Sequence, residues 1–106
     1  MVAGGTVFDG ANVENASYGL AICAERSAVA RAVFDGQTKV DTVVVATESS
    51  PPAAPCGMCL QTLHEFAGDP TSMRIILVNP DGERGDFTLA ELFPRGFHKS
   101  QLTDRE

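Results

Sequence analysis

Two short stretches of the sequence bring metal-binding and acid–base side chains close together. The first, CAER at residues 23–26, combines a thiol, a carboxylate and a guanidinium within one turn, and the second, CGMC at residues 56–59, is a Cys-x-x-Cys motif. The chain has three cysteines and its first residues do not resemble an export signal, which favours metal or redox chemistry in a reducing compartment over a disulfide framework. We therefore interpret the three thiols as candidate metal ligands.

Both motifs lie at the start of a predicted helix. Apolar residues recur at helical spacing over about residues 23–34 and 56–66. Thiolates at helix N-termini are stabilised by the positive end of the helix dipole and by free backbone N–H groups. If the two helices lie side by side on one face of a sheet, Cys23, Cys56 and Cys59 converge on one Zn²⁺. The fourth tetrahedral position then stays open for water, which is typical of a catalytic zinc site rather than a structural one.

The two charged residues of the first motif would complete this site. Three thiolates outweigh the charge of one Zn²⁺, and Arg26 could offset the excess by donating hydrogen bonds to the sulfur atoms. Glu25 lies two residues after Cys23, so it could reach a water molecule at the open position and shuttle protons without binding the metal. The alternative is a solvated first turn, in which Glu25 and Arg26 simply face water.

The rest of the sequence predicts an α/β fold. Residues 40–47 (VDTVVVAT) and 73–79 (MRIILVN) are β-branched apolar runs, typical of strands covered on both faces. A short strand precedes the first helix, and a turn at residues 79–82, a short strand near Phe87 and a capping box at residues 88–91 complete the pattern. This order predicts an α/β sandwich with a largely parallel sheet, in one domain that spans residues 1–106.

Charge and hydropathy narrow the class of partner. The chain has 106 residues and a formal net charge of −6, with its basic residues scattered. This argues against nucleic acid as the main partner, because neutralising phosphates requires Lys and Arg. No apolar run approaches the roughly 20 residues that a membrane-spanning helix needs. We therefore expect a cytoplasmic protein that acts on a small molecule, with no membrane partner.

Two longer stretches carry a resemblance to a known family. NVENASYGLAICAERSA at residues 12–28 and PCGMCLQTLHEF at residues 55–66 closely resemble the cytidine deaminase family. The signature of zinc nucleobase deaminases is H-x-E followed by P-C-x-x-C, and here Cys23 replaces the His, as in the small three-cysteine nucleoside deaminases. The similarity extends from about Phe8 to Phe97. It implies a three-layer α/β/α cytidine deaminase-like sandwich with a mixed, largely parallel sheet, assembled as a homotetramer.

The resemblance also implies a reaction. Zinc bound by the three cysteines would activate water for the hydrolytic deamination of cytidine or deoxycytidine to uridine or deoxyuridine, with release of ammonia, as a step of pyrimidine salvage. Glu25 would take a proton from that water and deliver protons to the ring N3 and to the leaving amine. Arg26 would compensate charge on the thiolates.

Further residues would bind the nucleoside. By the same resemblance, Asn12 and Glu14 would hold the ribose hydroxyls, and the backbone amide of Ala24 would hold the ring oxygen O2. The carbonyl of the residue before Pro55 would accept a hydrogen bond from the amino group. Tyr18 and Phe97 match positions that help to build the site of a neighbouring subunit.

Two features depart from the family pattern. Leu60 occupies a position where the family usually has an arginine, a second cation near the thiolates, so we expect a slower deaminase or a more alkaline pH optimum. The chain also starts at what resembles the family's second strand, so we expect the usual N-terminal helix and first strand to be absent. Two other functions stay open, an inactive zinc-stabilised deaminase-like subunit and a dithiol redox module that uses Cys56 and Cys59.

Overall fold

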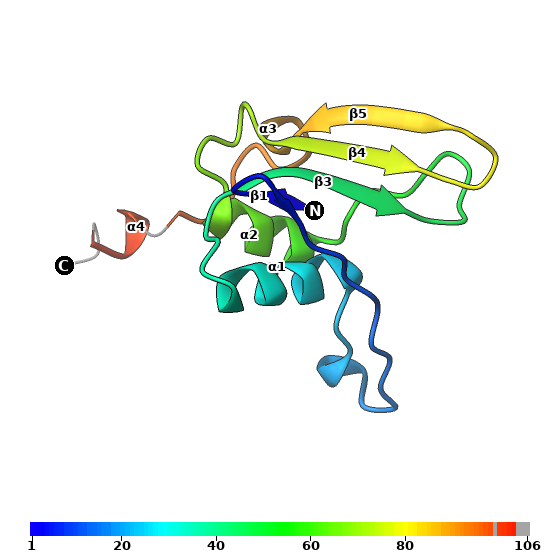
Figure 1. Ribbon diagram of the computed structural model, residues 1–106, viewed down its shortest axis with the longest axis horizontal. Helices are drawn as coiled ribbons and strands as arrows, with labels where there is room; N and C mark the ends of the chain where they lie inside the picture. Colours follow the sequence, from blue (N-terminus) through cyan, green and yellow to red (C-terminus); the bar gives the residue numbers. More distant parts are fainter. Residues whose placement is uncertain (99, 104–106) are drawn as a thin grey trace.

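The computed structural model describes residues 1–98 and 100–103, and within them five strands form one mixed sheet (Figure 1). Its strand order is β2–β1–β3–β4–β5. Strands β3 and β4 run parallel, whereas the other pairings are antiparallel. The bounds of the strands are Val2–Ala3 (β1), Thr6–Val7 (β2), Val40–Ala46 (β3), Arg74–Val78 (β4) and Arg84–Thr88 (β5).

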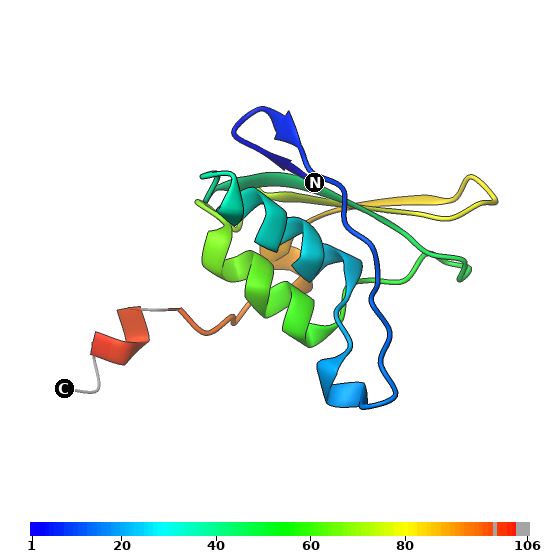
Figure 2. The ribbon, with the colours of Figure 1, turned by 60° about the horizontal axis from the view of Figure 1, so that its bottom comes forward.

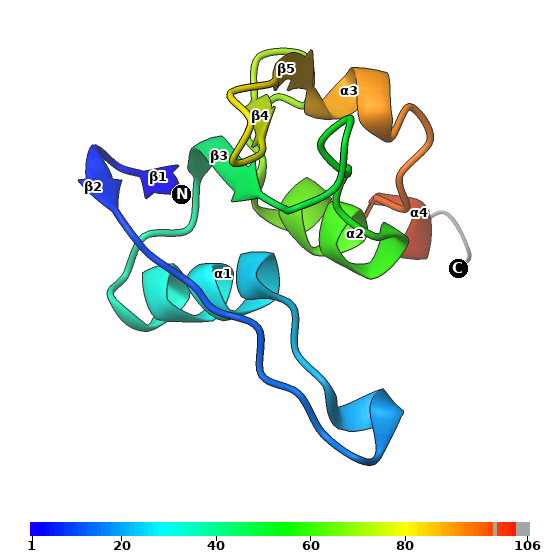
Figure 3. The same ribbon diagram turned by 90° about the vertical axis from the view of Figure 1, so that its right-hand side faces the viewer.

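The two long helices, α1 (Ala24–Phe34) and α2 (Gly57–Phe66), lie side by side against one face of the sheet (Figure 2). The short helix α3 (Leu89–Leu92) contacts α2 and β5, and α4 (Ser100–Thr103) lies at the C-terminal end. A 3₁₀ turn, η1 (Tyr18–Leu20), forms the tip of an arm that extends from the body (Figure 3). None of the described helices is long and apolar enough to cross a membrane.

The main core lies between the sheet and these helices. Side chains alternate between the two faces of a strand, and the register of β3 and β4 pairs Val43 with Ile75 on the helix side. Leu63 of α2 is fully buried against this layer. On the opposite face of β3, Val44 is 54% exposed. The apolar faces of α1 and α2 therefore pack on the face of the sheet that carries Val43 and Ile75.

The predicted α/β class with a mixed sheet is confirmed, but the sheet is not largely parallel. Among the described strands, only β3 and β4 pair in parallel, because β5 returns from β4 through a tight turn and β1 joins β2 through Gly4 and Gly5, with φ of 58° and 80°. Such short connections can only join antiparallel neighbours. In the part of the chain that the structure describes, α1, α2 and α3 pack on the same face of the sheet.

Strand β1 lies beside β3, on the edge of β3 that faces away from β4. Val2 pairs with Thr42 and Ala3 with Val40, with an irregular register between them. Because β1 has only two residues, β1 does not pair with residues 43–46 of β3. This stretch of β3 contributes to the wall of the pocket described below.

Replacing Leu63 by alanine tests the position of the core. We expect the free energy of unfolding to fall by about 2–5 kcal/mol, the usual cost of a cavity at a buried leucine. Chemical denaturation followed by circular dichroism gives this value. The control Val44→Ala removes an exposed side chain from the other face and should cost less than about 1 kcal/mol. Similar losses in both variants would contradict the assigned core.

Candidate active site

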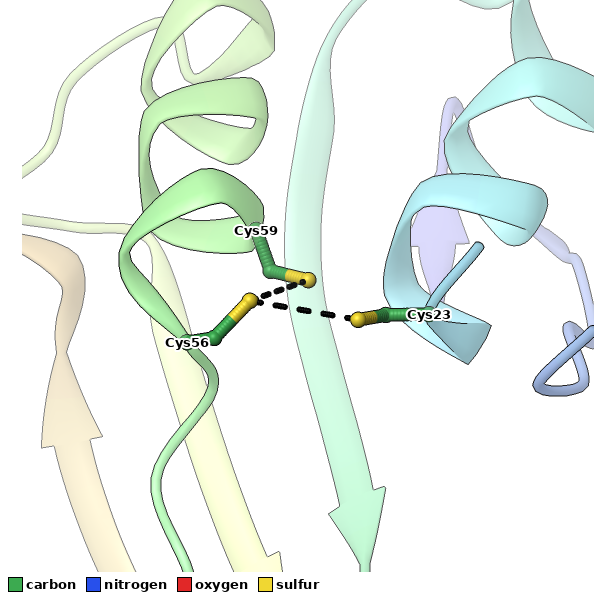
Figure 4. Close-up of side chains that lie close together, drawn as sticks. All are labelled: Cys23, Cys56 and Cys59. Atoms are coloured by element: carbon green, nitrogen blue, oxygen red, sulfur yellow. Dashed lines mark hydrogen bonds between the residues drawn. The ribbon is translucent and has the colours of Figure 1, made fainter. Parts of the chain in front are cut away.

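Two helix N-termini bring the three thiols together. Cys23 and Cys56 are the N-cap residues of α1 and α2, and Cys59 lies in the first turn of α2. The sulfur atoms face one another across the gap between the helices (Figure 4). The Sγ atom of Cys56 lies 3.3 Å from that of Cys59 and 3.9 Å from that of Cys23. The convergence that the sequence predicts is therefore present.

The three sulfur atoms fit a zinc ion. All three lie within 4.8 Å of one another, and three sulfurs bound at about 2.3 Å to a tetrahedral zinc would be about 3.8 Å apart. None of the cysteines is in a disulfide. Among the described residues, the cluster offers three donor groups, one fewer than tetrahedral coordination requires. The donor set is thus that of a zinc site with an open position.

The surroundings of the thiols differ in burial and charge. Cys59 is fully buried, and burial raises the pKa of its thiol. Cys56 is exposed at the start of α2, and the backbone N–H of Cys59 lowers the pKa of Cys56. The Nη2 atom of Arg26 lies 3.8 Å from the Sγ atom of Cys23, a contact that raises the pKa of Arg26. The same nitrogen donates to the carbonyl of Ala21 at 3.0 Å, which fixes the guanidinium beside the cluster.

A pocket of about 370 Å³ opens beside the thiols. This volume is typical of sites for small ligands. Its wall combines Asn12, the N-terminal end of α1, the stretch of β3 that β1 does not pair with and the end of the loop before α2; the lining includes residues 23–25, 43–47 and 54–56. Segments that are far apart in the sequence therefore meet at this pocket.

Glu25 lies in the wall of this pocket together with Cys23 and Cys56. Its side chain is half-buried, and it does not belong to the group of metal-donor atoms. The charge of Glu25 contributes to the raised pKa of Cys59, after burial and the contacts with the other two thiols, so the carboxylate is within electrostatic range of the cluster. A carboxylate placed beside a metal site without binding the ion is suited to proton transfer.

Asn12 makes a contact that the sequence analysis did not anticipate. Its Oδ1 atom accepts a hydrogen bond of 2.8 Å from the backbone N–H of Ala24. The amide that we expected to hold the ring oxygen therefore already has a partner. The bond also orients the Asn12 side chain, because Oδ1 faces Ala24 and Nδ2 is left to donate elsewhere.

Three of the predicted binding residues lie outside the pocket of their own chain. Glu14 and Tyr18 belong to the exposed arm, which a backbone bridge between Val13 and Ile22 closes, and Tyr18 is 90% exposed. Phe97 lies near the C-terminal end, where its backbone exchanges two hydrogen bonds with the side chain of Gln61. None of the three lines the pocket.

Leu60, which follows Cys59, packs in the main core. It is 8% exposed and packs with the buried residues of the sheet. An arginine introduced here would have to bury its charge or leave the core, and either change costs stability. A Leu60→Arg variant is therefore a poor probe of charge near the sulfur atoms.

Phe8 and the β3 stretch of residues 43–47 are pocket residues that sequence reasoning missed. Phe8 is 5% exposed and packs with Ala3 and Ala32 in a second, smaller core. The only sequence signal for Phe8 was a large apolar residue just before a glycine-containing turn, which is too common to indicate a site. The wall formed by β3 depends on where the pairing of β1 ends, and no local pattern encodes that.

Comparison with protein families agrees with this geometry. Residues 1–73 match the family model described as the cytidine and deoxycytidylate deaminase zinc-binding region. The chain belongs to this deaminase family.

Individual relatives support the assignment over most of the chain. The cytidine deaminase of Halalkalibacterium halodurans is 36% identical over 104 residues, which cover 98% of this chain and 77% of the relative. That of Mycoplasma pneumoniae is 40% identical, over 92% of this chain and 73% of the relative. The crystal structure of cytidine deaminase from Burkholderia pseudomallei superposes with a TM-score of 0.81 at 41% identity, covering 88% of this chain and 73% of that chain.

Family membership and the thiol cluster together settle the general chemistry. The predicted family, the cytidine deaminase enzyme class and the zinc cofactor are confirmed. The deaminase chain thus contains a zinc-binding region whose candidate ligands come from two adjacent helix starts.

Removing single thiols tests the assigned ligands. We expect the purified deaminase to hold about one zinc per chain, and Cys23→Ala, Cys56→Ala and Cys59→Ala each to lose most of it, because two remaining sulfurs bind zinc weakly. Elemental analysis after dialysis measures the metal. Met58→Ala, at a 63% exposed position between two of the cysteines, is the matched control and should keep its zinc. A cysteine whose removal leaves zinc content unchanged is not a ligand.

Proposed function

We propose that this chain catalyses the hydrolytic deamination of cytidine or deoxycytidine, which yields uridine or deoxyuridine and ammonia. The observation that carries the proposal is that Glu25 shares one pocket with Cys23 and Cys56 without being a metal donor. A zinc ion held by Cys23, Cys56 and Cys59 would supply the Lewis acid that activates water for attack on C4 of the ring.

Glu25 is the proton carrier in this proposal. It takes one proton from the attacking water and delivers it to the ring N3, then takes the second proton from the new hydroxyl on C4 and gives it to the amine as the C–N bond breaks and ammonia leaves. Its half-buried position in the pocket wall supports this role, because a carboxylate that is partly shielded from solvent and next to the thiols can reach both the water and the ring. Arg26 offsets negative charge on the sulfur atoms through its contact with Cys23.

The nucleoside is positioned by groups on two sides of the pocket. Asn12 holds a ribose hydroxyl through Nδ2 while Oδ1 stays bonded to the amide of Ala24. The Ala24 N–H then serves the ring oxygen O2 by sharing its hydrogen between the two acceptors. On the other side, the carbonyl of Ala54 accepts a hydrogen bond from the amino group at C4, a role supported by the position of Ala54 in the pocket wall.

A homotetramer would account for the residues that lie outside the pocket. The arm exposes several large apolar side chains, and exposed apolar clusters of this kind favour burial against another subunit: Val13, Tyr18, Leu20 and Ile22. In such an assembly Glu14, Tyr18 and Phe97 would reach the site of a neighbour. The free thiols fit the reducing cytoplasm, where the reaction would serve pyrimidine salvage.

The decisive experiment compares the wild-type chain with Glu25→Gln. The wild type should convert cytidine to uridine with release of ammonia, and Glu25→Gln should lower kcat by about 10²- to 10⁴-fold, the usual contribution of a general acid–base. Absorbance change on cytidine measures turnover, and elemental analysis shows that zinc is retained. The control Asp9→Asn makes the same charge change at another pocket residue and should leave kcat nearly unchanged.

The other outcomes of this experiment identify the competing functions. Bound zinc without any ammonia release would indicate an inactive deaminase-like subunit. Absence of zinc, together with a reversible Cys56–Cys59 disulfide, would indicate a dithiol redox module. Wild-type turnover that survives in Glu25→Gln would refute the assigned role of the carboxylate.

The ribose contact is tested by Asn12→Ala. Loss of one hydrogen bond of about 0.5–1.5 kcal/mol should raise KM for cytidine about 2- to 12-fold. With 2′,3′-dideoxycytidine, which has no hydroxyl at these positions, the increase should disappear. Asn15→Ala is the matched control, because Asn15 Oδ1 also accepts from a backbone N–H, that of Ser17, but lies outside the pocket. Equal increases with both substrates would show that Asn12 acts only through Ala24.

A further inference from the structure

The loop of residues 47–55 connects the end of β3 to the start of α2 and has no regular secondary structure. Its last two residues, Ala54 and Pro55, lie in the pocket wall, and Cys56 follows directly. In the proposed reaction this loop carries the carbonyl that recognises the amino group. A loop with three prolines and no helix or strand needs other contacts to hold it in place.

Asn79, in the turn between β4 and β5, supplies the first of these contacts. It is the one polar side chain among the buried core residues that the structure describes, with 9% exposure. Its Nδ2 atom donates to the carbonyl of Ser49 at 3.0 Å and to Oε1 of Glu83 at 2.9 Å. Its Oδ1 atom accepts from the backbone N–H groups of Asp81 and Glu83, at 3.1 Å and 3.0 Å. The amide is therefore fully used, which fixes its orientation.

Glu83 supplies the second contact with the loop. Its carboxylate accepts a hydrogen bond from the hydroxyl of Ser50 as well as from Asn79. The Ser50 hydroxyl and the Asn79 amide lower the pKa of Glu83, so the carboxylate is ionised at neutral pH and both bonds are charge-assisted. Two successive loop residues, Ser49 and Ser50, are thus tied to the β4–β5 turn.

Hydrogen bonds within the loop carry this anchoring toward the pocket. The hydroxyl of Ser49 donates to the carbonyl of Pro51 at 3.1 Å and lies 3.2 Å from that of Thr47. Thr47 Oγ1 accepts from the backbone N–H of Ala53 at 3.0 Å, and the Thr47 N–H donates to the carbonyl of Val78 in β4 at 3.0 Å. A continuous set of contacts therefore runs from the β4–β5 turn to the residue before Ala54.

We propose that Asn79 and Glu83 are positioning residues of the active site, which set the place of the Ala54 carbonyl and thereby the discrimination between an amino and an oxo group at C4. Neither residue lines the pocket. They act through Ser49, Ser50 and the loop that follows. For its substrate chemistry this inference rests on the proposed deaminase function, whereas the mechanical link between turn and loop does not.

The variant Asn79→Asp tests the link with little change in size. Aspartate keeps both acceptor bonds but loses the donation to Ser49 and places a second carboxylate against Glu83. A shift of about 1 Å in a positioning group can cost about 100-fold in rate, so we expect kcat/KM for cytidine to fall about tenfold or more. Zinc content should stay the same. The Ki of uridine divided by the KM of cytidine should fall by about threefold or more, because one lost hydrogen bond affects only the substrate with the amino group.

A second substitution should restore part of the loss. In Asn79→Asp/Glu83→Gln, the new amide at position 83 can donate to the aspartate at position 79 while its oxygen still accepts from Ser50. The hydrogen bond between positions 79 and 83 then forms again, with donor and acceptor exchanged. We expect the double variant to recover at least part of kcat/KM and of the uridine-to-cytidine ratio. A double variant that is as impaired as Asn79→Asp, or worse, would contradict the role of the Asn79–Glu83 contact.

Asp69→Asn is the matched control. Asp69 Oδ1 accepts from the hydroxyl and the backbone N–H of Thr71, at 2.7 Å and 2.9 Å. These bonds lower the pKa of Asp69, just as the bonds from Ser50 and Asn79 lower the pKa of Glu83. Asp69 follows the C-terminal end of α2, whereas the thiols lie at its N-terminal end. The control should therefore lower stability slightly at neutral pH, a difference from the wild type that disappears as the pH falls through the lowered pKa of Asp69, and it should change neither kcat/KM nor the uridine-to-cytidine ratio.

A readout without turnover separates this inference from the proposed function. Amide hydrogen exchange at Ala53, whose N–H is bonded to Thr47, should speed up about tenfold or more in Asn79→Asp if the loop is released. If the wild type deaminates nothing, the proposed function fails, yet faster exchange at Ala53 would still support the link. The inference would be overturned if hydrogen exchange at Ala53 did not change in Asn79→Asp. It would also be overturned if activity fell while the Ki of uridine divided by the KM of cytidine stayed the same. Where Asn79→Asp does not fold, the exposed Glu83→Ala provides the same measurements.

Discussion

The close approach of three sulfur atoms is the constraint on which the other features of the site depend. Thiolates within 4.8 Å of one another repel strongly unless positive charge compensates them. The chain provides that charge from three sources: the N-terminal ends of α1 and α2, the guanidinium of Arg26, and the zinc ion that this family binds. The contact of Arg26 with Cys23 is local to the start of α1, whereas the combined dipoles and a shared zinc ion require the two helices to begin side by side, so the packing of α1 against α2 comes first.

The core makes that packing possible because its apolar contacts lie on one face of the sheet. Alternate residues of β3 and β4, such as Val43 and Ile75, form a platform on which α1 and α2 lie side by side. Because β3 and β4 run parallel, the loop that follows β3 and the turn that follows β4 begin at the same edge of the sheet. The pocket arises where this platform ends, between the first turn of α1 and the loop that leads to Cys56. Core and pocket are therefore two parts of one arrangement.

Hydrogen bonds of side-chain amides fix backbone segments around the pocket that the apolar core does not hold by itself. The Ala24 amide is bonded to the side chain of Asn12, which ties one side of the pocket to the start of α1. Across the pocket, Asn79 and Glu83 are hydrogen-bonded to Ser49 and Ser50 of the loop that contains Ala54. Both sides of the site thus have a side-chain amide that is bonded to the backbone, Asn12 through Oδ1 and Asn79 through both of its polar atoms. Side-chain amides suit this task because they donate and accept in fixed directions.

Local sequence patterns determined the elements and the chemistry, because helix periodicity, capping and ligand type act between near neighbours. The strand predicted at residues 40–47 is Val40–Ala46, the second helix is Gly57–Phe66, and the capping box of Thr88 and Glu91 is formed. Only the tertiary structure decided the strand order, the antiparallel pairings, the burial of Leu60 and the contacts of Asn79. These features join residues far apart in the chain, and their free energy depends on which surfaces meet after folding.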